Sequence, residues 1–348
     1  MDASVDLAPC RLLRPALVVE DLTLRYLTRR GEVKAVDGVS FTLAPGQALG
    51  LVGESGCGKT SVAMSLMKLL PDNARLIRGR VLLGEHDLLT MTEGELRRFR
   101  WRRISMVFQA AMNSLDPVYR VGEQIVEAIE NHNCEDSRQQ ARSRVSRLFG
   151  LVGLEPQMVD RYPHELSGGM RQRVAIAMAL ACEPDVIIAD EITTALDVIV
   201  QDRILRELRL IQNDLQMSMV YITHDMAVVA EVTDRLGVMY AGKLVEMGDT
   251  SEVFGQPLHP YTEALLRSFP SIRGEKLPLI GLPGEPPDLI QTPPGCRFHP
   301  RCPSATEICR QKVPPKVQIG THWADCWHPL AVTATGGRVP GDQIHGAN

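Results

Sequence analysis

The sequence lacks long apolar runs and any strong excess of one charge. No apolar stretch approaches the roughly 20 residues of a membrane span. The opening MDASVDLAPCRLLRPALVVE is interrupted by Arg11 and Arg14, so it has no apolar core of signal-peptide length. The net charge of -4 provides no general attraction to nucleic acid or to an acidic membrane. These absences predict a cytosolic protein and exclude a membrane-spanning one.

The composition is that of an ordinary globular protein. With 348 residues and 44% hydrophobic side chains, the chain can form about two folding units with a sizeable core. Its eight cysteines are unevenly distributed: Cys10, Cys57, Cys134 and Cys182 are scattered, whereas the other four lie beyond residue 295. In a chain without an export signal, such a cluster indicates a metal site more often than disulfides.

The order of elements predicts an α/β fold. Residues 16–43 alternate like two antiparallel strands around the turn TRRGE, and QALGLVGES then enters a Gly-rich loop followed by a helix. Helical patterns over about 112–183 separate the strands ISMVFQ and DVIIADE, which indicates an α-helical insertion. A hairpin is expected at Ala241 and Gly242. Nine of the 23 prolines lie from Pro257 to Pro294, which predicts a loop-rich extension.

The stretch GESGCGKT fits the phosphate-binding pattern G-x-x-x-x-G-K-[ST]. Its glycines allow backbone amides to surround phosphates, Lys59 neutralises the β and γ oxygens, and Thr60 offers a hydroxyl to Mg²⁺. Because the stretch lies between a strand and a helix, a simple glycine-rich turn is the weaker interpretation. The predicted nucleotide-binding residues here are Gly53, Glu54, Ser55, Gly56, Cys57, Gly58, Lys59, Thr60 and Ser61.

Two later strands end in polar side chains. At the end of DVIIADE, Asp190 could hold the Mg²⁺ water shell and Glu191 could orient an attacking water. YITHD places His224 where an imidazole could touch the γ-phosphate. Solvated carboxylates and a structural histidine are the alternatives, and the Gly-rich loop makes them less favourable.

A second possible anion site lies in HELSGGMRQR. A small hydroxyl at Ser167 and the glycines Gly168 and Gly169 precede a helix-forming segment, as expected for a phosphate at a helix N-terminus. One bound nucleotide does not explain two such sites.

In this order, GESGCGKT, VFQ, LSGGM, VIIADE, TALD and ITHD resemble the ATPase subunit of an ABC transporter, with a RecA-like P-loop core. The resemblance implies that Gln109 senses Mg²⁺ and the membrane subunit, that Asp197 contacts the partner ATPase and that His224 is a switch. It also implies that Tyr26 stacks on adenine, although a tyrosine on an alternating strand is often a core residue.

The resemblance explains the second anion site. In this family two ATPase domains pair head to tail, and the LSGGM helix of one caps the γ-phosphate bound by the other. The sequence departs from the family at Ile192, where proline is usual, and at Met170, where glutamine is commoner. Without the proline, the backbone next to Glu191 lacks a restraint on φ, so the orientation of the Glu191 side chain is less fixed.

The segments PLHPYTEALLRSFP and GLPGEPPDL resemble the oligopeptide and dipeptide importer ATPases. This implies a peripheral protein at the cytoplasmic face of the membrane, with a second, paralogous ATPase, two permease subunits and an extracytoplasmic substrate-binding protein. A metal chelate, glutathione or a saccharide is the alternative substrate. The expected parts are a leader at 1–15, an ATPase domain at 16–255 with its helical subdomain at about 112–183, and an extension at 256–348.

The last four cysteines have the spacing C-x5-C-x6-C-x16-C: Cys296, Cys302, Cys309 and Cys326. Four thiolates suit a 4Fe-4S cluster or structural Zn²⁺, and zinc favours C-x2-C pairs, which are absent. Members of the resembling importer branch carry a 4Fe-4S cluster at a similar set, so the cluster is preferred, as a structural staple rather than a redox sensor. Free thiols or disulfides are the remaining alternative. The nearby His299, His322 and His328 could replace a ligand, but they are expected at the surface.

Two rival classes fit less well. Soluble ABC ATPases of ribosomes or DNA carry paired cassettes, coiled coils or zinc modules that this chain lacks, and a P-loop kinase or GTPase leaves LSGGM unexplained. RRFRWRR, residues 97–103, is interpreted as a solvated helix end or a face near lipid headgroups rather than a nucleic-acid patch, since Glu93 and Glu95 precede it.

Overall fold

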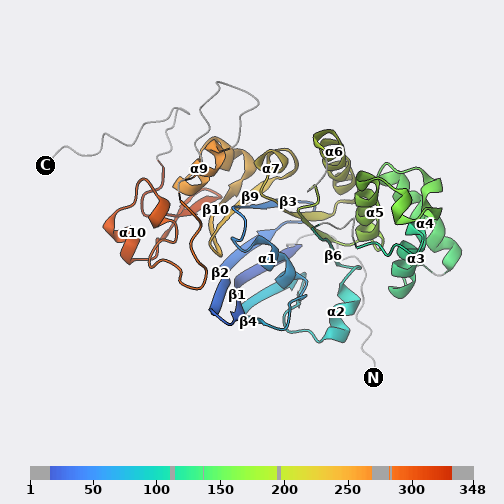
Figure 1. Ribbon diagram of the computed structural model, residues 1–348, viewed down its shortest axis with the longest axis horizontal. Coiled ribbons are helices and arrows are strands. Elements are labelled where there is room, and N and C mark those ends of the chain that lie inside the picture. The colour runs from blue at the N-terminus through green and yellow to red at the C-terminus, as the bar shows by residue number, and fades with distance from the viewer. Residues whose placement is uncertain are drawn as a thin grey trace.

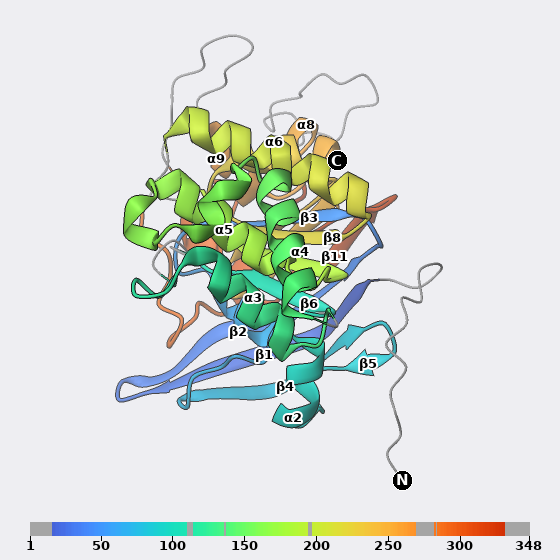
Figure 2. The ribbon, with the colours of Figure 1, turned by 90° about the vertical axis from the view of Figure 1, so that its right-hand side faces the viewer.

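The computed structural model describes residues 16–109, 114–135, 137–193, 197–268, 282 and 284–330. Two sheets, packed one over the other, form the centre of the molecule, and helices cover them (Figures 1 and 2). The expected leader at 1–15 lies outside the described residues.

The smaller sheet is antiparallel, with strand order β2-β1-β4-β5. The turn expected at TRRGE joins its two longest strands, and their alternating apolar residues face the same core as α1. This sheet is therefore the predicted antiparallel edge. Its strands are β1 (Leu17–Thr28), β2 (Gly31–Leu43), β4 (Ala74–Leu83) and β5 (His86–Asp87).

The larger sheet has the order β11-β12-β10-β9-β3-β8-β7-β6. Its parallel centre consists of short, fully buried apolar strands, as expected for strands covered on both faces. These are β3 (Ala48–Val52), β6 (Ile104–Val107), β7 (Val186–Asp190) and β8 (Ser218–Ile222), with β9 (Arg235–Tyr240) parallel to β3. The predicted hairpin at Ala241 and Gly242 is confirmed, because β9 pairs antiparallel with β10 (Lys243–Asp249).

Helices flank this centre. The inserted helical subdomain gathers α3, α4 and α5 at one end of the molecule, on a core shared with β7 and β8 (Figure 1). No helix within the described ranges is both long enough and apolar enough to cross a membrane. Up to residue 267, the helical segments of the described residues are α1 (Lys59–Leu66), α2 (Glu93–Phe99), α3 (Val121–Asn131), α4 (Arg138–Leu151), η2 (Pro156–Asp160), η3 (Pro163–Glu165), α5 (Gly168–Leu180), α6 (Val198–Leu215), α7 (Met226–Val232), α8 (Thr250–Gly255) and α9 (Pro260–Arg267).

The C-terminal extension is more regular than its proline content suggested. Residues 284–330, here called the cysteine module, contain η4 (His299–Arg301), α10 (Glu307–Gln311), β11 (Lys316–Ile319) and β12 (His322–Asp325). The strand β12 pairs with β10 and so extends the large sheet. These two strands were not part of the expected loop-rich extension, because pairing with an existing edge compensates for strands that are too short and polar to be recognised alone.

Candidate functional site

The Gly-rich loop connects β3 to α1 and has a conformation that requires glycine. Gly53 and Gly58 have φ angles of 150° and 107°. A Cβ atom would lie 2.1 Å from the Met239 carbonyl oxygen at Gly53 and 2.1 Å from that of Ala35 at Gly58. At Gly56 an added Cβ would meet nothing within 4 Å, so this side of the loop is open to a ligand.

Lys59 is buried against the loop, with 6% of its surface exposed. Its ammonium donates hydrogen bonds to the carbonyl oxygens of Gly53, at 2.7 Å, and Glu54, at 3.1 Å. The cation therefore lies where the backbone amides of the loop would meet a phosphate. Tyr26 donates a hydrogen bond to Ser61 Oγ at 3.2 Å, which holds this aromatic ring beside the start of α1.

Asp190 ends β7 next to this loop. Thr60 Oγ1 lies 3.4 Å from Asp190 Oδ1, so the two groups predicted to face Mg²⁺ are neighbours. Burial raises the pKa of Asp190 to about 6, and the nearby charge of Glu191 acts in the same direction. A carboxylate that is 1% exposed is costly to ionise without a cation, which is the environment expected of a divalent-metal ligand.

Glu191 brings the predicted catalytic groups together. Gln109 Nε2 donates a hydrogen bond to Glu191 Oε2 at 2.7 Å, and His224 Nδ1 lies 3.0 Å from Oε1. The three side chains follow the carboxyl ends of β6, β7 and β8, neighbouring parallel strands whose ends meet at one edge. The sequence-predicted Glu191, Gln109 and His224 thus form one cluster.

Two features define the direction of Glu191. Its φ angle is 48°, an uncommon conformation for a non-glycine residue, and its amide donates to the Ile222 carbonyl oxygen at 2.8 Å. Ile192, which replaces the usual proline, is buried in the core of the helical subdomain. Core packing therefore restrains the residue after Glu191, and proline is not required for that purpose.

The LSGGM segment lies in the other part of the molecule. Ser167 is the N-cap of α5, where its hydroxyl accepts a hydrogen bond from the Met170 amide, and Gly168 and Gly169 form the first turn. Asp197 similarly caps α6 and accepts from the Val200 amide at 2.9 Å. In Figure 1, α5 lies with α3 and α4, whereas α1 with its Gly-rich loop lies beside β1 and β2. The structure does not bring these two predicted anion sites together within one chain.

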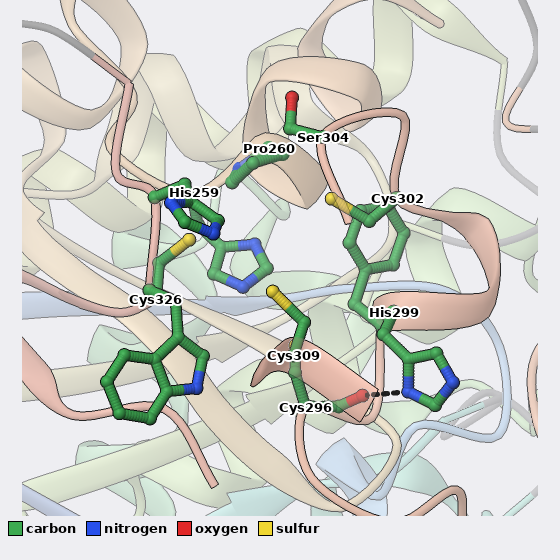
Figure 3. A pocket seen from close by; sticks show the side chains of 11 residues that line it. His259, Pro260, Cys296, His299, Cys302, Ser304, Cys309 and Cys326 are labelled. Carbon is green, nitrogen blue, oxygen red and sulfur yellow. Dashed lines mark hydrogen bonds between the residues drawn. The ribbon is translucent and has the colours of Figure 1, made fainter. Parts of the chain in front are cut away.

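The four clustered cysteines line one cavity. Figure 3 shows them around a common space, with His259 and Pro260 at its border. Burial raises the pKa of the Cys296 thiol, that of Cys302 to about 11 and that of Cys326 to about 12. The seven cysteines in the described ranges are all free thiols.

The fit to a metal group can be tested on this cavity. Within the described residues, no three His, Cys, Asp or Glu side chains lie close enough to hold a single metal ion. This arrangement by itself supports neither Zn²⁺ nor a 4Fe-4S cluster. The four thiols nevertheless line one shared cavity.

His259 is a cavity residue that the sequence did not indicate. The Tyr261 amide donates to its Nδ1 at 3.0 Å, so the neutral ring carries its proton on Nε2. Burial lowers the pKa of this histidine to about 4, which keeps it neutral. Its ring is 1% exposed, and Nε2 has no partner in the described part of the chain. A buried N–H donor beside four thiols calls for an acceptor in the cavity.

The three histidines expected at the surface differ from one another. His299 and His328 both line the cavity. His328 is exposed and bonds Thr306, and the Nδ1 atom of His299 is 2.9 Å from the Cys296 carbonyl oxygen. The prediction was wrong for His322, which is buried with its Nε2 2.7 Å from a carboxylate oxygen of Glu246. A buried carboxylate keeps this ring inside the fold.

This fold, the Gly-rich loop and the acidic strand ends define a P-loop ATPase of the ABC class. The protein-family model described as "ABC transporter" matches residues 36–194 of this chain. The family model described as "Oligopeptide/dipeptide transporter, C-terminal region" matches residues 245–309. A dimeric structure of a post-hydrolysis state of the ATP-binding cassette MJ0796, bound to ADP and Pi, superposes with a TM-score of 0.61 at 26% identity, covering 67% of this chain and 98% of that chain.

Similar proteins narrow the class. The "Dipeptide transport ATP-binding protein DppD" of Bacillus subtilis (strain 168) is 44% identical over 319 residues, or 90% of this chain and 95% of that protein. The "Oligopeptide transport ATP-binding protein OppD" of Escherichia coli (strain K12) is 44% identical over 316 residues, or 90% and 93%. The chain belongs to this family of dipeptide and oligopeptide transport ATP-binding proteins.

Proposed function

We propose that this chain is the ATP-hydrolysing subunit of an ABC importer that takes up dipeptides or oligopeptides. The observation that carries the proposal is the Glu191 carboxylate, bonded on one oxygen by Gln109 and close to His224 on the other, next to Asp190 and the Gly-rich loop. A base held in this way can accept the proton of a water that attacks the γ-phosphorus of ATP.

The remaining groups bind and neutralise the substrate. Lys59 provides a cation to the phosphates, and the amides of the Gly-rich loop provide hydrogen-bond donors. Thr60, Gln109 and Asp190 supply oxygen ligands for Mg²⁺, which neutralises phosphate charge when bound. Tyr26 offers its ring to the adenine. Hydrolysis breaks the bond between the γ-phosphorus and the bridging oxygen and releases ADP and phosphate.

The separation of the two anion sites supports a paired mechanism. The ATP site on the Gly-rich loop of one chain is completed by Ser167, Gly168 and Gly169 of the neighbouring ATPase. Asp197 lies at the contact between the two ATPases. Opposing helix N-termini attract the triphosphate, and phosphate release removes that attraction. Closure and opening of the pair then drive the attached permease subunits.

Substitution Glu191→Gln tests the base. We expect hydrolysis to fall by at least about 100-fold while ATP binding persists and the ATPase pair remains closed. The measurements are phosphate release and the mass of the ATP-loaded complex by light scattering. Undiminished hydrolysis in this variant would defeat the assignment.

The peptide substrate is supported by the relatives' names and by the C-terminal region that the family model matches. A strain lacking this chain should lose uptake of radiolabelled dipeptides or oligopeptides and regain it on complementation. Loss of metal-chelate, glutathione or saccharide uptake instead would replace the peptide assignment.

The partners follow from the same family. We propose a second, paralogous ATPase, two permeases and an extracytoplasmic binding protein, with this chain peripheral at the cytoplasmic face of the membrane. Affinity purification from detergent-solubilised membranes should recover the permeases. Recovery with ribosomes or DNA, and without integral membrane proteins, would favour the soluble ABC ATPase alternative.

We also propose that Cys296, Cys302, Cys309 and Cys326 hold a 4Fe-4S cluster that staples the cysteine module. The shared cavity and the unpartnered His259 Nε2 support this proposal, since cluster sulfur accepts hydrogen bonds. Protein purified without oxygen should contain about four iron and four sulfide per chain. Stoichiometric zinc without iron would reverse the assignment.

A further inference from the structure

A buried ion pair connects the cysteine module to the Gly-rich loop. Arg301 Nη1 lies 2.6 Å from Glu54 Oε2, and Nη2 lies 2.9 Å from Oε1. The Arg301 side chain is 5% exposed and that of Glu54 is 23% exposed. Two parallel charge-assisted bonds fix both the position and the orientation of the carboxylate. Glu54 belongs to the GESGCGKT stretch, yet its side chain is turned to the module.

The backbone of Glu54 is held from the same side. Its amide donates to the Tyr261 hydroxyl of α9 at 3.0 Å. Tyr261 packs against Tyr240 and Phe298, with ring centroids 4.6 and 5.3 Å apart. Side chain and backbone of one loop residue are thus attached to residues from the C-terminal third of the chain.

The position of Arg301 depends on the cysteine cavity. Arg301 ends η4, immediately before Cys302, and Phe298 and His299 of the same turn line that cavity. The Cys296 amide donates to the Cys309 carbonyl oxygen at 2.8 Å and so closes this segment around the cavity. A change that opens the cavity would therefore move the turn that carries the guanidinium.

A second path reaches the opposite end of the loop. Arg297 is buried and bonds both the Asp37 carboxylate and the Ala241 carbonyl oxygen at the turn between β9 and β10. The next residue in that turn, Gly242, donates its amide to the Cys57 carbonyl oxygen at 2.8 Å. Arg297 and Arg301 of the cysteine module are therefore both connected to the Gly-rich loop by hydrogen bonds.

The charge of Arg301 also favours ATP binding. Without a cation, the Glu54 carboxylate would repel an incoming triphosphate from within the loop that must bind it. Arg301 neutralises this charge at hydrogen-bond distance. The pair thus orders the loop before binding and also lowers the cost of bringing a polyanion to it.

We infer that the cysteine module clamps the Gly-rich loop through Arg301 and Glu54, which makes Arg301 a positioning residue that sets the affinity of the loop for ATP. The inference rests on ATP as the ligand of this loop. Because coupling is reciprocal, bound ATP also stabilises the closed cysteine cavity.

The test compares wild-type protein with Arg301→Met, Glu54→Gln and the double variant. Methionine keeps much of the packing on Tyr240 and removes the charge. Arg301→Met should weaken ATP binding, measured with a fluorescent ATP analogue, by about 5- to 30-fold, with kcat at saturating ATP changed less than about twofold. Glu54→Gln loses the ordering bonds but keeps the Arg301 cation beside the loop, so it should weaken ATP binding by a smaller factor. The double variant should be no weaker than the worse single variant, because both remove one interaction.

The matched control is Arg310→Met, an exposed arginine of the same module that should bind ATP like the wild type. ATP should also slow amide hydrogen exchange across residues 296–302 in the wild type and not in Arg301→Met, as measured by mass spectrometry. If Arg301→Met fails to fold, Glu54→Gln still tests the pair.

Wild-type affinity in both single variants, or ATP protection that survives Arg301→Met, would overturn the clamp. Failure of the wild type itself to bind ATP would instead overturn the proposed function. The two failures are therefore distinguishable.

Discussion

Gln109 Nε2 lies 2.7 Å from Glu191 Oε2 and donates a hydrogen bond to it. Gln109 follows β6 and Glu191 follows β7, so the contact spans two neighbouring strands of the parallel sheet. The amide therefore holds one oxygen of the proposed base. Movement of the segment after β6, where the resemblance places contact with the membrane subunit, would change the aim of Glu191.

Substitution Gln109→Ala should reduce kcat for ATP hydrolysis by about 10- to 100-fold, because a misplaced base loses much of its advantage. The KM for ATP should change less than about threefold. Steady-state phosphate release measures both constants. Gln139→Ala, on the exposed surface of α4, is the control and should behave like the wild type. An equal loss in the control, or full activity in Gln109→Ala, would contradict the assigned role.

The double variant Gln109→Ala/His224→Ala should lose less activity than the product of the two single losses. Both residues act on the same carboxylate, so their effects are coupled. A double-mutant cycle on kcat measures this coupling, and the combined loss should not exceed that of Glu191→Gln. Strictly multiplicative losses would show that His224 acts independently of Glu191.

Substitution Asp190→Asn should stabilise the protein in the absence of nucleotide and divalent metal. The folded-state pKa of Asp190, about 6, lies above the ordinary value of 3.8 for an aspartate, so this group disfavours folding once it is ionised. The cost, about 2 to 3 kcal/mol, is fully present above pH 6 and disappears as the pH falls toward 3.8. Thermal unfolding in EDTA should show a higher Tm for the variant at pH 7.5 and a smaller difference at pH 5. An equal difference at both pH values would contradict the shift.

Substitution His259→Asn should shorten the lifetime of iron in the cysteine cavity. Asparagine can still accept from the Tyr261 amide, but it lacks a donor at the position of Nε2. Iron release to a chelator should be about fivefold faster, since an outer hydrogen bond to the group is lost. The control is His328→Asn, because the ring of His328 already bonds Thr306. Equal rates of iron release in the two variants would contradict the role of His259 Nε2 as a hydrogen-bond donor.

The nucleotide site was predictable because its geometry is local. A strand, a glycine loop and a helix follow one another in GESGCGKT, and carboxylates at the ends of parallel strands must meet at one edge. Contacts between segments that are far apart in the sequence leave no comparable local pattern. Arg301 and Glu54 are 247 positions apart, and nothing near either residue indicates its partner.

The cysteine module illustrates the same limit. The spacing of its cysteines predicts a common site, and the four side chains do line one cavity. The position of His259 in the cavity was not predicted, because the stretch HPYT that it begins also fits a surface turn before a helix. His322 was expected to be exposed, but Glu246, which is 76 positions away in sequence and lies on the neighbouring strand β10, bonds it in the interior.

The central claim is that ATP binds between the Gly-rich loop of one chain and the LSGGM segment of another. Substitution Ser167→Arg in this chain, assembled with its ATPase partner and permeases, tests it most directly. Ser137→Arg, at the exposed N-cap of α4, is the matched control. We predict that Ser167→Arg lowers ATPase activity of the complex at least about 100-fold, that ATP affinity of the isolated chain stays within about twofold, and that the control changes neither. Full activity of the Ser167→Arg complex, or loss of ATP binding by the isolated variant chain, would contradict the account.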